Sequence, residues 1–237
     1  MTIKYLKSLG VAVVVCASAQ AASADDAGYK PNLYVSAGAG LSVILDKDVT
    51  LRSTGNPTSI LTAGFDSGIA LSGAVGTKLP YGFRAELEAG FSNNAFGDSI
   101  NAIAPIPGVV DASGETQVTT FIANLLYDHD VTDAFGLFLG AGAGVAIVDV
   151  NLRRGLAQPT IIIARGSDTR FAYQAIVGGS YDITDDIEFW GRYSYLGTVG
   201  NNFSALNTGV NMIIQADVPI DRHTAMIGFT AHFGLTD

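Results

Sequence analysis

The stretch FAYQAIVGGSYDITDDIEFWGRYSY, residues 171–195, decides how the rest of the chain is interpreted. Every second residue from Phe171 to Tyr181 is apolar or small, and the same holds from Ile187 to Tyr195, on the other side of a polar turn. A period of two predicts an antiparallel hairpin of two long strands. The apolar face carries aromatic residues near the strand ends. A soluble sheet would bury this face, whereas a membrane barrel would turn it to lipid, with aromatic residues at both interfaces.

The composition favours the second arrangement. The chain has 237 residues, of which 48% are hydrophobic and only 15% charged, and its mean hydropathy is +0.32. This is too apolar for an ordinary soluble surface. Outside the first two dozen residues, however, there is no apolar run of about 18 residues, the length that a spanning helix requires. Apolar content without helical spans indicates strands that divide their faces between lipid and lumen.

The N-terminus predicts export. Lys4 and Lys7 form a basic region, residues 9–19 an apolar region, and small residues precede Ala24, so we expect signal cleavage between Ala24 and Asp25, with the alternative site after Ala21 left open. The expected organisation is a signal peptide at 1–24, a short periplasmic leader at 25–32 and a barrel at 33–237.

Cleavage would remove the single cysteine and two of the 13 basic residues, leaving 11 against 22 acidic residues, a net charge of −11. So acidic a protein is a poor partner for nucleic acid.

The same alternation recurs along the chain. Strands are expected at about 33–43, 68–75, 83–91, 120–127, 135–148, 171–181, 187–195 and 224–233. Three short turns, at 78–82, 128–133 and 182–186, alternate with four long loops, at 46–64, 93–117, 149–170 and 197–221. The flanks of the third loop, which contains three consecutive isoleucines, are expected to extend their strands beyond the membrane. The pattern predicts an all-β fold, an eight-stranded antiparallel up-and-down transmembrane β-barrel. Both termini and the short turns would be periplasmic, and the long loops extracellular.

Several short segments add a resemblance: LYVSAG at 33–38, NLLYD at 124–128, GAGAG at 140–144, AYQ at 172–174, YDITD at 181–185 and RYSY at 192–195. In order and spacing they are similar to the outer-membrane β-barrel domain family of Gram-negative surface proteins, the small OmpA/OmpX-like barrels often called the porin family. One departure is that such barrels usually end on an aromatic residue, whereas four residues follow Phe233 here.

The resemblance implies a non-enzymatic integral protein of the cell outer membrane that serves envelope structure and surface interaction and uses no cofactor. Its implied partners are outer-membrane lipid and lipopolysaccharide, the barrel assembly machinery, and an extracellular ligand or host surface reached through the loops. A narrow channel for small solutes or ions is the alternative function.

Five charged residues share the polar parity of their strands: Arg84, Glu86, Glu88, Glu188 and Arg192. An arginine on the lipid face near the midplane costs roughly 2–4 kcal/mol, so all five are expected in the lumen, where they can pair across a narrow interior. They are interpreted as a structural salt-bridge plug, and a gated or proton-conducting path is the functional alternative. Gly140, Gly142 and Gly144 are expected to make room there for large side chains such as Phe138.

Three other patterns in the sequence do not define a site. The spacing of the three glycines is not that of a dinucleotide-binding loop. Asp128-His129-Asp130 could form a metal or catalytic site, but aspartates are common in turns for backbone reasons. Ser204, Asp221 and His223 share one loop region, as a lipid-A-modifying barrel enzyme would require, but nothing in the sequence fixes them as a triad. We therefore assign no catalytic, cofactor-binding or metal-binding residue.

Overall fold

The structure is a computed structural model that describes residues 32–45, 47–52, 59–104, 108–154, 163–199, 203–207, 212–217 and 220–233. Side chains are described in 32–45, 66–95, 114–151, 166–199 and 220–233. The described part of the chain contains no helix long and apolar enough to cross a membrane. The predicted signal peptide and its cleavage site lie outside the described residues, as does the leader as far as residue 31.

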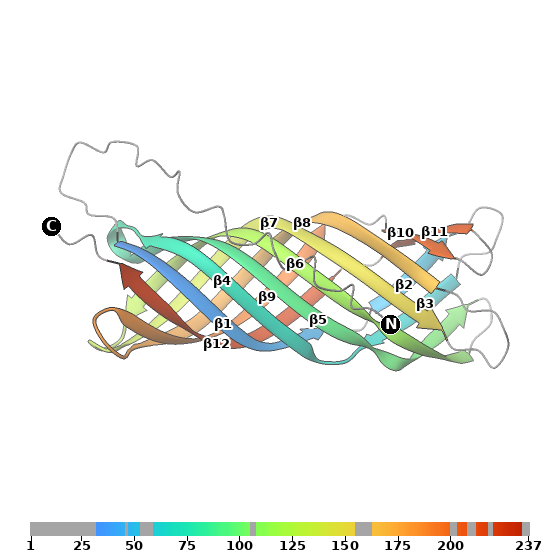
Figure 1. Cartoon of the computed structure of the whole chain (residues 1–237), viewed down its shortest axis with the longest axis horizontal. Helices are drawn as coiled ribbons and strands as arrows, with labels where there is room; N and C mark the ends of the chain where they lie inside the picture. Colours follow the sequence, from blue (N-terminus) through green and yellow to red (C-terminus); the bar gives the residue numbers. More distant parts are fainter. Residues whose placement is uncertain are drawn as a thin grey trace, which may run out of the picture.

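Eight long strands form a closed antiparallel barrel (Figure 1). They are β1 (Asn32–Ile44), β4 (Gly68–Lys78), β5 (Phe83–Ala104), β6 (Gly108–Asp130), β7 (Phe135–Arg154), β8 (Ile163–Asp182), β9 (Ile187–Val199) and β12 (Asp221–Phe233). Each strand pairs with the next in this order, and β12 closes the barrel on β1 from Leu33 opposite Phe233 to Ile44 opposite Arg222. Closure leaves no unpaired strand edge in the barrel wall, as a lipid environment requires. The predicted fold class is confirmed.

Three tight connections join strands at one end of the barrel, which we call the short-turn end. The first is the 3₁₀ turn η1 (Pro80–Gly82), in which Tyr81 has φ +64°. In the other two, the hydroxyl oxygens of Thr132 and Thr184 accept hydrogen bonds from the backbone N–H groups of Phe135 and Ile187. Such side-chain bonds fix the turn locally. The predicted positions of the three short turns are correct, and β1 begins and β12 ends at this same end.

The predicted long loops are mostly strand, which corrects the sequence interpretation. β5 to β8 each run for 20 or more residues, and four further strands lie within the connections that were assigned as loops. These are β2 (Lys47–Arg52), β3 (Ser59–Phe65), β10 (Phe203–Asn207) and β11 (Met212–Asp217).

β3 pairs with β5, β2 with β3 and β11, and β10 with β11 and β8. Together with the far ends of β5 to β8, these strands make a second ring that continues the barrel, which we call the outer tier (Figure 1). Only the expectation that the flanks of the loop at 149–170 extend their strands foresaw any of this. The extension is confirmed, because β7 runs to Arg154 and β8 begins at Ile163.

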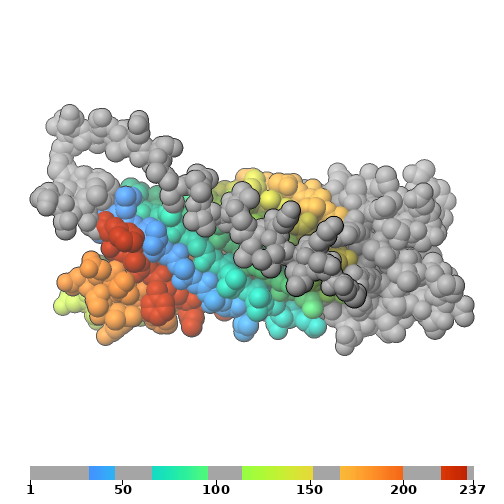
Figure 2. All heavy atoms as spheres, in the orientation of Figure 1, coloured from blue at the N-terminus to red at the C-terminus, as the bar shows by residue number. Residues whose placement is uncertain are grey.

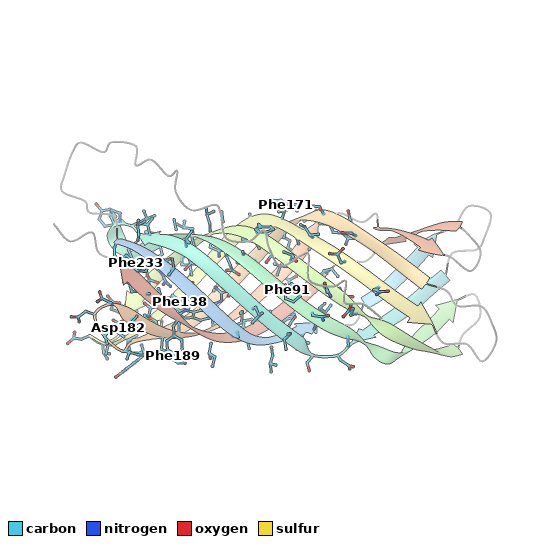
Figure 3. All side chains as sticks on the ribbon, viewed as in Figure 1. Phe91, Phe138, Phe171, Asp182, Phe189 and Phe233 are labelled. Carbon is cyan, nitrogen blue, oxygen red and sulfur yellow. The ribbon has the colours of Figure 1, made fainter. Side chains whose placement is uncertain are left out.

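We call the part of the barrel between the short-turn end and the outer tier the lower barrel. Its outer face is an apolar band. Leu41, Leu87 and Ile227 each expose about 60% of their surface, with values of 62%, 60% and 62%. In Figure 2, β1, β4 and β12 cross this face as slanted bands. Aromatic residues border the band at both ends, with Phe189 and Phe233 near the short-turn end and Phe91 and Phe171 toward the outer tier (Figure 3). An apolar band between two aromatic girdles is the surface of a membrane-spanning barrel.

Candidate functional site in the barrel interior

All five charged residues of the predicted lumen network lie inside the barrel. Arg84, Glu86, Glu88 and Glu188 expose 4%, 7%, 7% and 5% of their surface, and the Arg192 side chain exposes 7%. The strand pleat places them there, because their outward neighbours on β5 and β9, such as Leu87 and Tyr193, form part of the apolar band. The network does not form one chain of ion pairs, however. It divides into two groups that lie at different distances from the short-turn end.

The first group lies near the short-turn end around Arg84. Its guanidinium Nε is 2.9 Å from Oδ2 of Asp128, and its Nη1 is 3.7 Å from Oε1 of Glu188. The second oxygen of Glu188 is 3.6 Å from Nε2 of His232. Glu86 is bound differently, because the hydroxyl of Tyr34 donates a 2.8 Å hydrogen bond to its Oε1. Arg84 of β5 therefore links the carboxylates of two other strands, β6 and β9.

The second group surrounds Glu88 in the middle of the barrel. Its Oε1 is 3.1 Å from Nη2 of Arg192, and its Oε2 accepts hydrogen bonds from the amides of Asn124 at 3.0 Å and Gln174 at 3.3 Å. Gln174 also donates to Oδ1 of Asn124 at 2.7 Å, and Arg192 donates to the Ser72 hydroxyl at 3.1 Å. Residues of three other strands bind this one buried carboxylate, which satisfies its acceptor oxygens in a confined interior.

Aromatic rings cover the two arginines. The Arg84 guanidinium carbon lies 5.1 Å from the centroid of Phe138, and that of Arg192 lies 5.0 Å from the centroid of Trp190. These distances are within the range of cation–π attraction. The rings need glycines opposite them, since a Cβ on Gly178 would lie 2.3 Å from Phe138 and one on Gly228 2.3 Å from Trp190. The expectation that glycines make room for large side chains in the lumen is therefore confirmed. The glycine that makes room for Phe138, however, is Gly178 and not Gly140, Gly142 or Gly144.

The run of glycines at 140–144 makes room for other side chains. A Cβ on Gly142 would lie 1.9 Å from Oδ1 of Asn124. This glycine thus admits the amide that holds Glu88. Nothing in the short-range sequence pattern identifies this pairing, because the two residues are 18 positions apart and meet only through the β6–β7 register.

The interior between Glu88 and the outer tier is also occupied by side chains. Arg222, which the sequence analysis did not single out, donates a 3.0 Å hydrogen bond from Nη1 to the Ser92 hydroxyl. The Asn94 amide donates to the Ser42 carbonyl at 2.9 Å. Beside these polar groups, a cluster of buried apolar side chains includes Val118, Ile122, Val148, Ala172, Leu196 and Ile220. Side chains thus occupy the interior at each described level.

The other candidate residues do not come together as a reactive site. Asp128 pairs with Arg84, while the neighbouring His129 and Asp130 are exposed. No three His, Cys, Asp or Glu side chains in the described part of the chain could hold one metal ion. Asp221 and His223 each contact a tyrosine of β9. The side chain of Ser204 lies outside those described.

A closed antiparallel barrel with a lipid-facing apolar band and a polar interior defines the class, a membrane-spanning β-barrel protein. The family described as "Outer membrane protein beta-barrel domain" matches residues 9–233, and the chain belongs to this family. The resemblance in the sequence is thereby confirmed, and the chain is an outer-membrane barrel protein.

Two curated relatives carry names of the same kind. The "Outer membrane protein" of Gluconacetobacter diazotrophicus is 30% identical over 162 residues, which are 63% of this chain and 42% of the relative. The "Outer membrane protein PagN" of Salmonella typhimurium is 28% identical over 152 residues, 60% of this chain and 54% of the relative. The chain thus spans about half the length of the curated relatives it matches.

Among solved structures, that of the outer membrane protein OprG from Pseudomonas aeruginosa is similar, with a TM-score of 0.56. The match covers 87% of this chain and 98% of OprG at 15% identity, so the likeness concerns the fold alone.

Proposed function

We propose that this chain is a non-enzymatic integral outer-membrane protein that contributes to envelope structure and binds extracellular ligands or a host surface through its outer tier. The observation that carries the proposal is the combination of an occupied interior with strands that continue beyond the apolar band. An interior filled by side chains provides a rigid scaffold rather than a conduit. The paired ends of β5 and β6 and of β7 and β8 then form the end of that scaffold, a position where binding residues are commonly found.

The proposed orientation places both termini and the short turns in the periplasm and the outer tier outside the cell. It is supported by the usual arrangement of such barrels, in which periplasmic turns are short and extracellular connections long. The apolar band would contact outer-membrane lipid and lipopolysaccharide. The barrel assembly machinery would act on the strand β12, which ends at Phe233.

Epitope insertion tests the orientation. A tag between Ala104 and Gly108, or between Asn207 and Met212, should bind antibody on intact cells. A tag after Asp130, in a short turn, should bind antibody only after the outer membrane is permeabilised. Antibody binding to the Asp130 tag on intact cells would overturn the orientation.

Planar-bilayer recording tests the alternative of a narrow channel. The unmodified protein should show no large and long-lived open state, because Arg84, Phe138, Glu88, Arg192 and Trp190 occupy the interior together. Reconstituted protein should first be shown to be folded by its different migration before and after boiling on a denaturing gel. Stable pore currents from such protein would favour the channel.

Trimming the outer tier tests the proposed surface role. Residues 99–102 pair with residues 108–111 at the ends of β5 and β6, so a variant that lacks residues 99–111 and closes the hairpin should retain the lower barrel. Its migration on a gel should still change on boiling, while adhesion of cells that carry it to collagen- or laminin-coated surfaces should fall to the level of cells without the protein. Equal adhesion of the trimmed and full-length proteins would contradict this role for the β5–β6 end.

The non-enzymatic part of the proposal is supported by the partners of the candidate reactive residues. His223 is hydrogen-bonded to Tyr193, and Asp221 accepts a hydrogen bond from Tyr195. A triad would instead require the imidazole to be oriented by the carboxylate. If His223→Ala lost an outer-membrane deacylation of lipid A that the unmodified protein carried out, the enzyme alternative would be established.

A further inference from the structure

The outward face of β8, β9 and β12 carries a group of polar aromatic side chains where the apolar band meets the outer tier. We call Tyr173, Tyr193, Tyr195, Asp221 and His223 the outer-girdle platform. Tyr173 and Tyr193 are 43% and 45% exposed, and the other three are partly exposed. These residues face away from the interior, so they take no part in the side-chain network described above.

Hydrogen bonds and ring contacts hold the platform together. The Tyr195 hydroxyl donates a 2.9 Å hydrogen bond to Oδ1 of Asp221, and the Tyr193 hydroxyl is hydrogen-bonded to Nδ1 of His223. The His223 ring centroid is 5.3 Å from that of Tyr195. Because His223 and Tyr195 are directly opposite in the β9–β12 register, backbone pairing fixes their relative positions.

Tyr173 extends the platform across β9. A Cβ on Gly197 would lie 2.5 Å from Cζ of Tyr173, so the phenol ring lies over this glycine, its register partner. Its centroid is 6.3 Å from that of Tyr195. The three strands therefore present a continuous surface of ring faces, hydroxyls, an imidazole and a carboxylate.

The girdle at the short-turn end has a different chemistry. There Phe83 packs against Tyr127 with a centroid distance of 5.3 Å, and Phe189 packs against Phe229 at 5.4 Å. These are ring-packing contacts, whereas two tyrosines of the outer-girdle platform are also hydrogen-bonded to Asp221 and His223.

We propose that the outer-girdle platform docks the glucosamine headgroup of a lipid-A-type glycolipid in the outer leaflet. The proposal rests on the orientation given under the proposed function. Sugars offer C–H faces that pack on aromatic rings and hydroxyls that donate to carboxylates and accept from phenols.

A sugar fits the platform better than a phosphate does. Among the described side chains, the ionisable groups in contact with these tyrosines are Asp221 and His223, whereas phosphate sites typically use arginine or lysine. Arg222, between them in sequence, points inward and binds Ser92. Recognition therefore centres on the hydroxyl groups of the glycolipid rather than on its charge.

Lipid binding to purified protein in detergent tests the docking. Native mass spectrometry would titrate the protein with lipid A, with fully dephosphorylated lipid A and with phosphatidylglycerol. The matched variants are Tyr195→Phe combined with Asp221→Asn on the platform, and Tyr127→Phe on the opposite girdle as the control. All variants should be shown to be folded by the change of gel migration on boiling.

The platform variant should bind lipid A roughly tenfold more weakly than the unmodified protein does, as expected for the loss of hydrogen bonds to a sugar. The control should bind like the unmodified protein. Dephosphorylated lipid A should show the same dependence on the platform, and phosphatidylglycerol should show none.

Equal loss for phosphatidylglycerol, or a dependence that disappears with the phosphates, would overturn the proposal, as would unchanged lipid A binding by the folded platform variant. These measurements do not depend on orientation, so such a failure leaves the proposed function intact. An inverted epitope pattern would instead overturn the orientation and, with it, docking in the outer leaflet.

Discussion

Replacing Arg84 with methionine should destabilise the barrel strongly. The change removes two ion pairs, with Asp128 at 2.9 Å and Glu188 at 3.7 Å, and the contact with Phe138. Removing one partner of a buried ion pair typically costs about 3–5 kcal/mol, because the remaining charge stays buried. Since 27% of the Asp128 side chain is exposed, water can compensate part of this loss, and we expect the lower end of that range. Methionine fills similar volume, so a cavity contributes little.

The free energy of unfolding can be measured by urea titration of protein in lipid vesicles, with fluorescence of Trp190, the only tryptophan, as the signal. A double-mutant cycle with Glu188→Gln separates the Arg84–Glu188 pair from the other contacts, and we expect a coupling of about 0.5–3 kcal/mol between these neighbours. His232 stays close to residue 188 in both backgrounds and cancels in the cycle. A total loss below about 1 kcal/mol for Arg84→Met, the range of exposed pairs, would refute the argument that this arginine is a buried structural cation.

Two further pairs of substitutions test the packing on each side of the barrel wall by the same unfolding measurement. Gly228→Ala should destabilise the barrel by about 1–3 kcal/mol, because its Cβ would lie 2.3 Å from both Trp190 and the Ala37 carbonyl oxygen. As the matched control, Gly191→Ala should change the stability by less than about 0.5 kcal/mol, because a Cβ at Gly191 would meet nothing within 4 Å. Leu87→Arg, in the middle of the apolar band, should cost roughly 2–4 kcal/mol in a lipid bilayer and Val131→Arg, in a short turn, at most about 1 kcal/mol. Equal effects within either pair would contradict the assigned surroundings.

The lower barrel could be predicted from the sequence because a single-layer wall obeys one simple rule. Each residue faces either lipid or lumen, so Leu87 and Glu88 had to take opposite sides, and a slip of one residue would have placed three charges of β5 in lipid. The short turns between these strands were recognisable for the same reason, since the alternation stops where lipid contact ends.

The outer tier was missed because that rule depends on lipid. Beyond the apolar band both faces of a strand can be polar, so the hydrophobic alternation disappears while backbone pairing continues. Asn93 opposite Gln117 and Asn94 opposite Thr116 are paired strand residues with no apolar member. Polar stretches of this kind are typical of loops when only composition is considered.

The partners within the interior were not predictable, because they depend on strand stagger rather than on parity. Parity placed Glu86 and Glu88 in the lumen, but not the contact of Glu86 with Tyr34, 52 residues away, or that of Glu88 with Gln174, 86 residues away. Like-charged neighbours on one strand thus acquire unlike environments. One carboxylate accepts from a phenol, and the other pairs with an arginine and two amides.

These separate environments bear on whether the interior could open. A path along the barrel axis would have to displace Arg84 from its two carboxylates near the short-turn end and also Arg192 from Glu88 in the middle of the barrel. No described ion pair or hydrogen bond joins the two groups directly, so opening one would not release the other, and the costs of breaking buried pairs would add. A gate usually needs one element with two arrangements of similar energy. Two independent groups anchored on different strands fit a permanent brace better, and this favours the outer tier as the part of the protein that interacts with its surroundings.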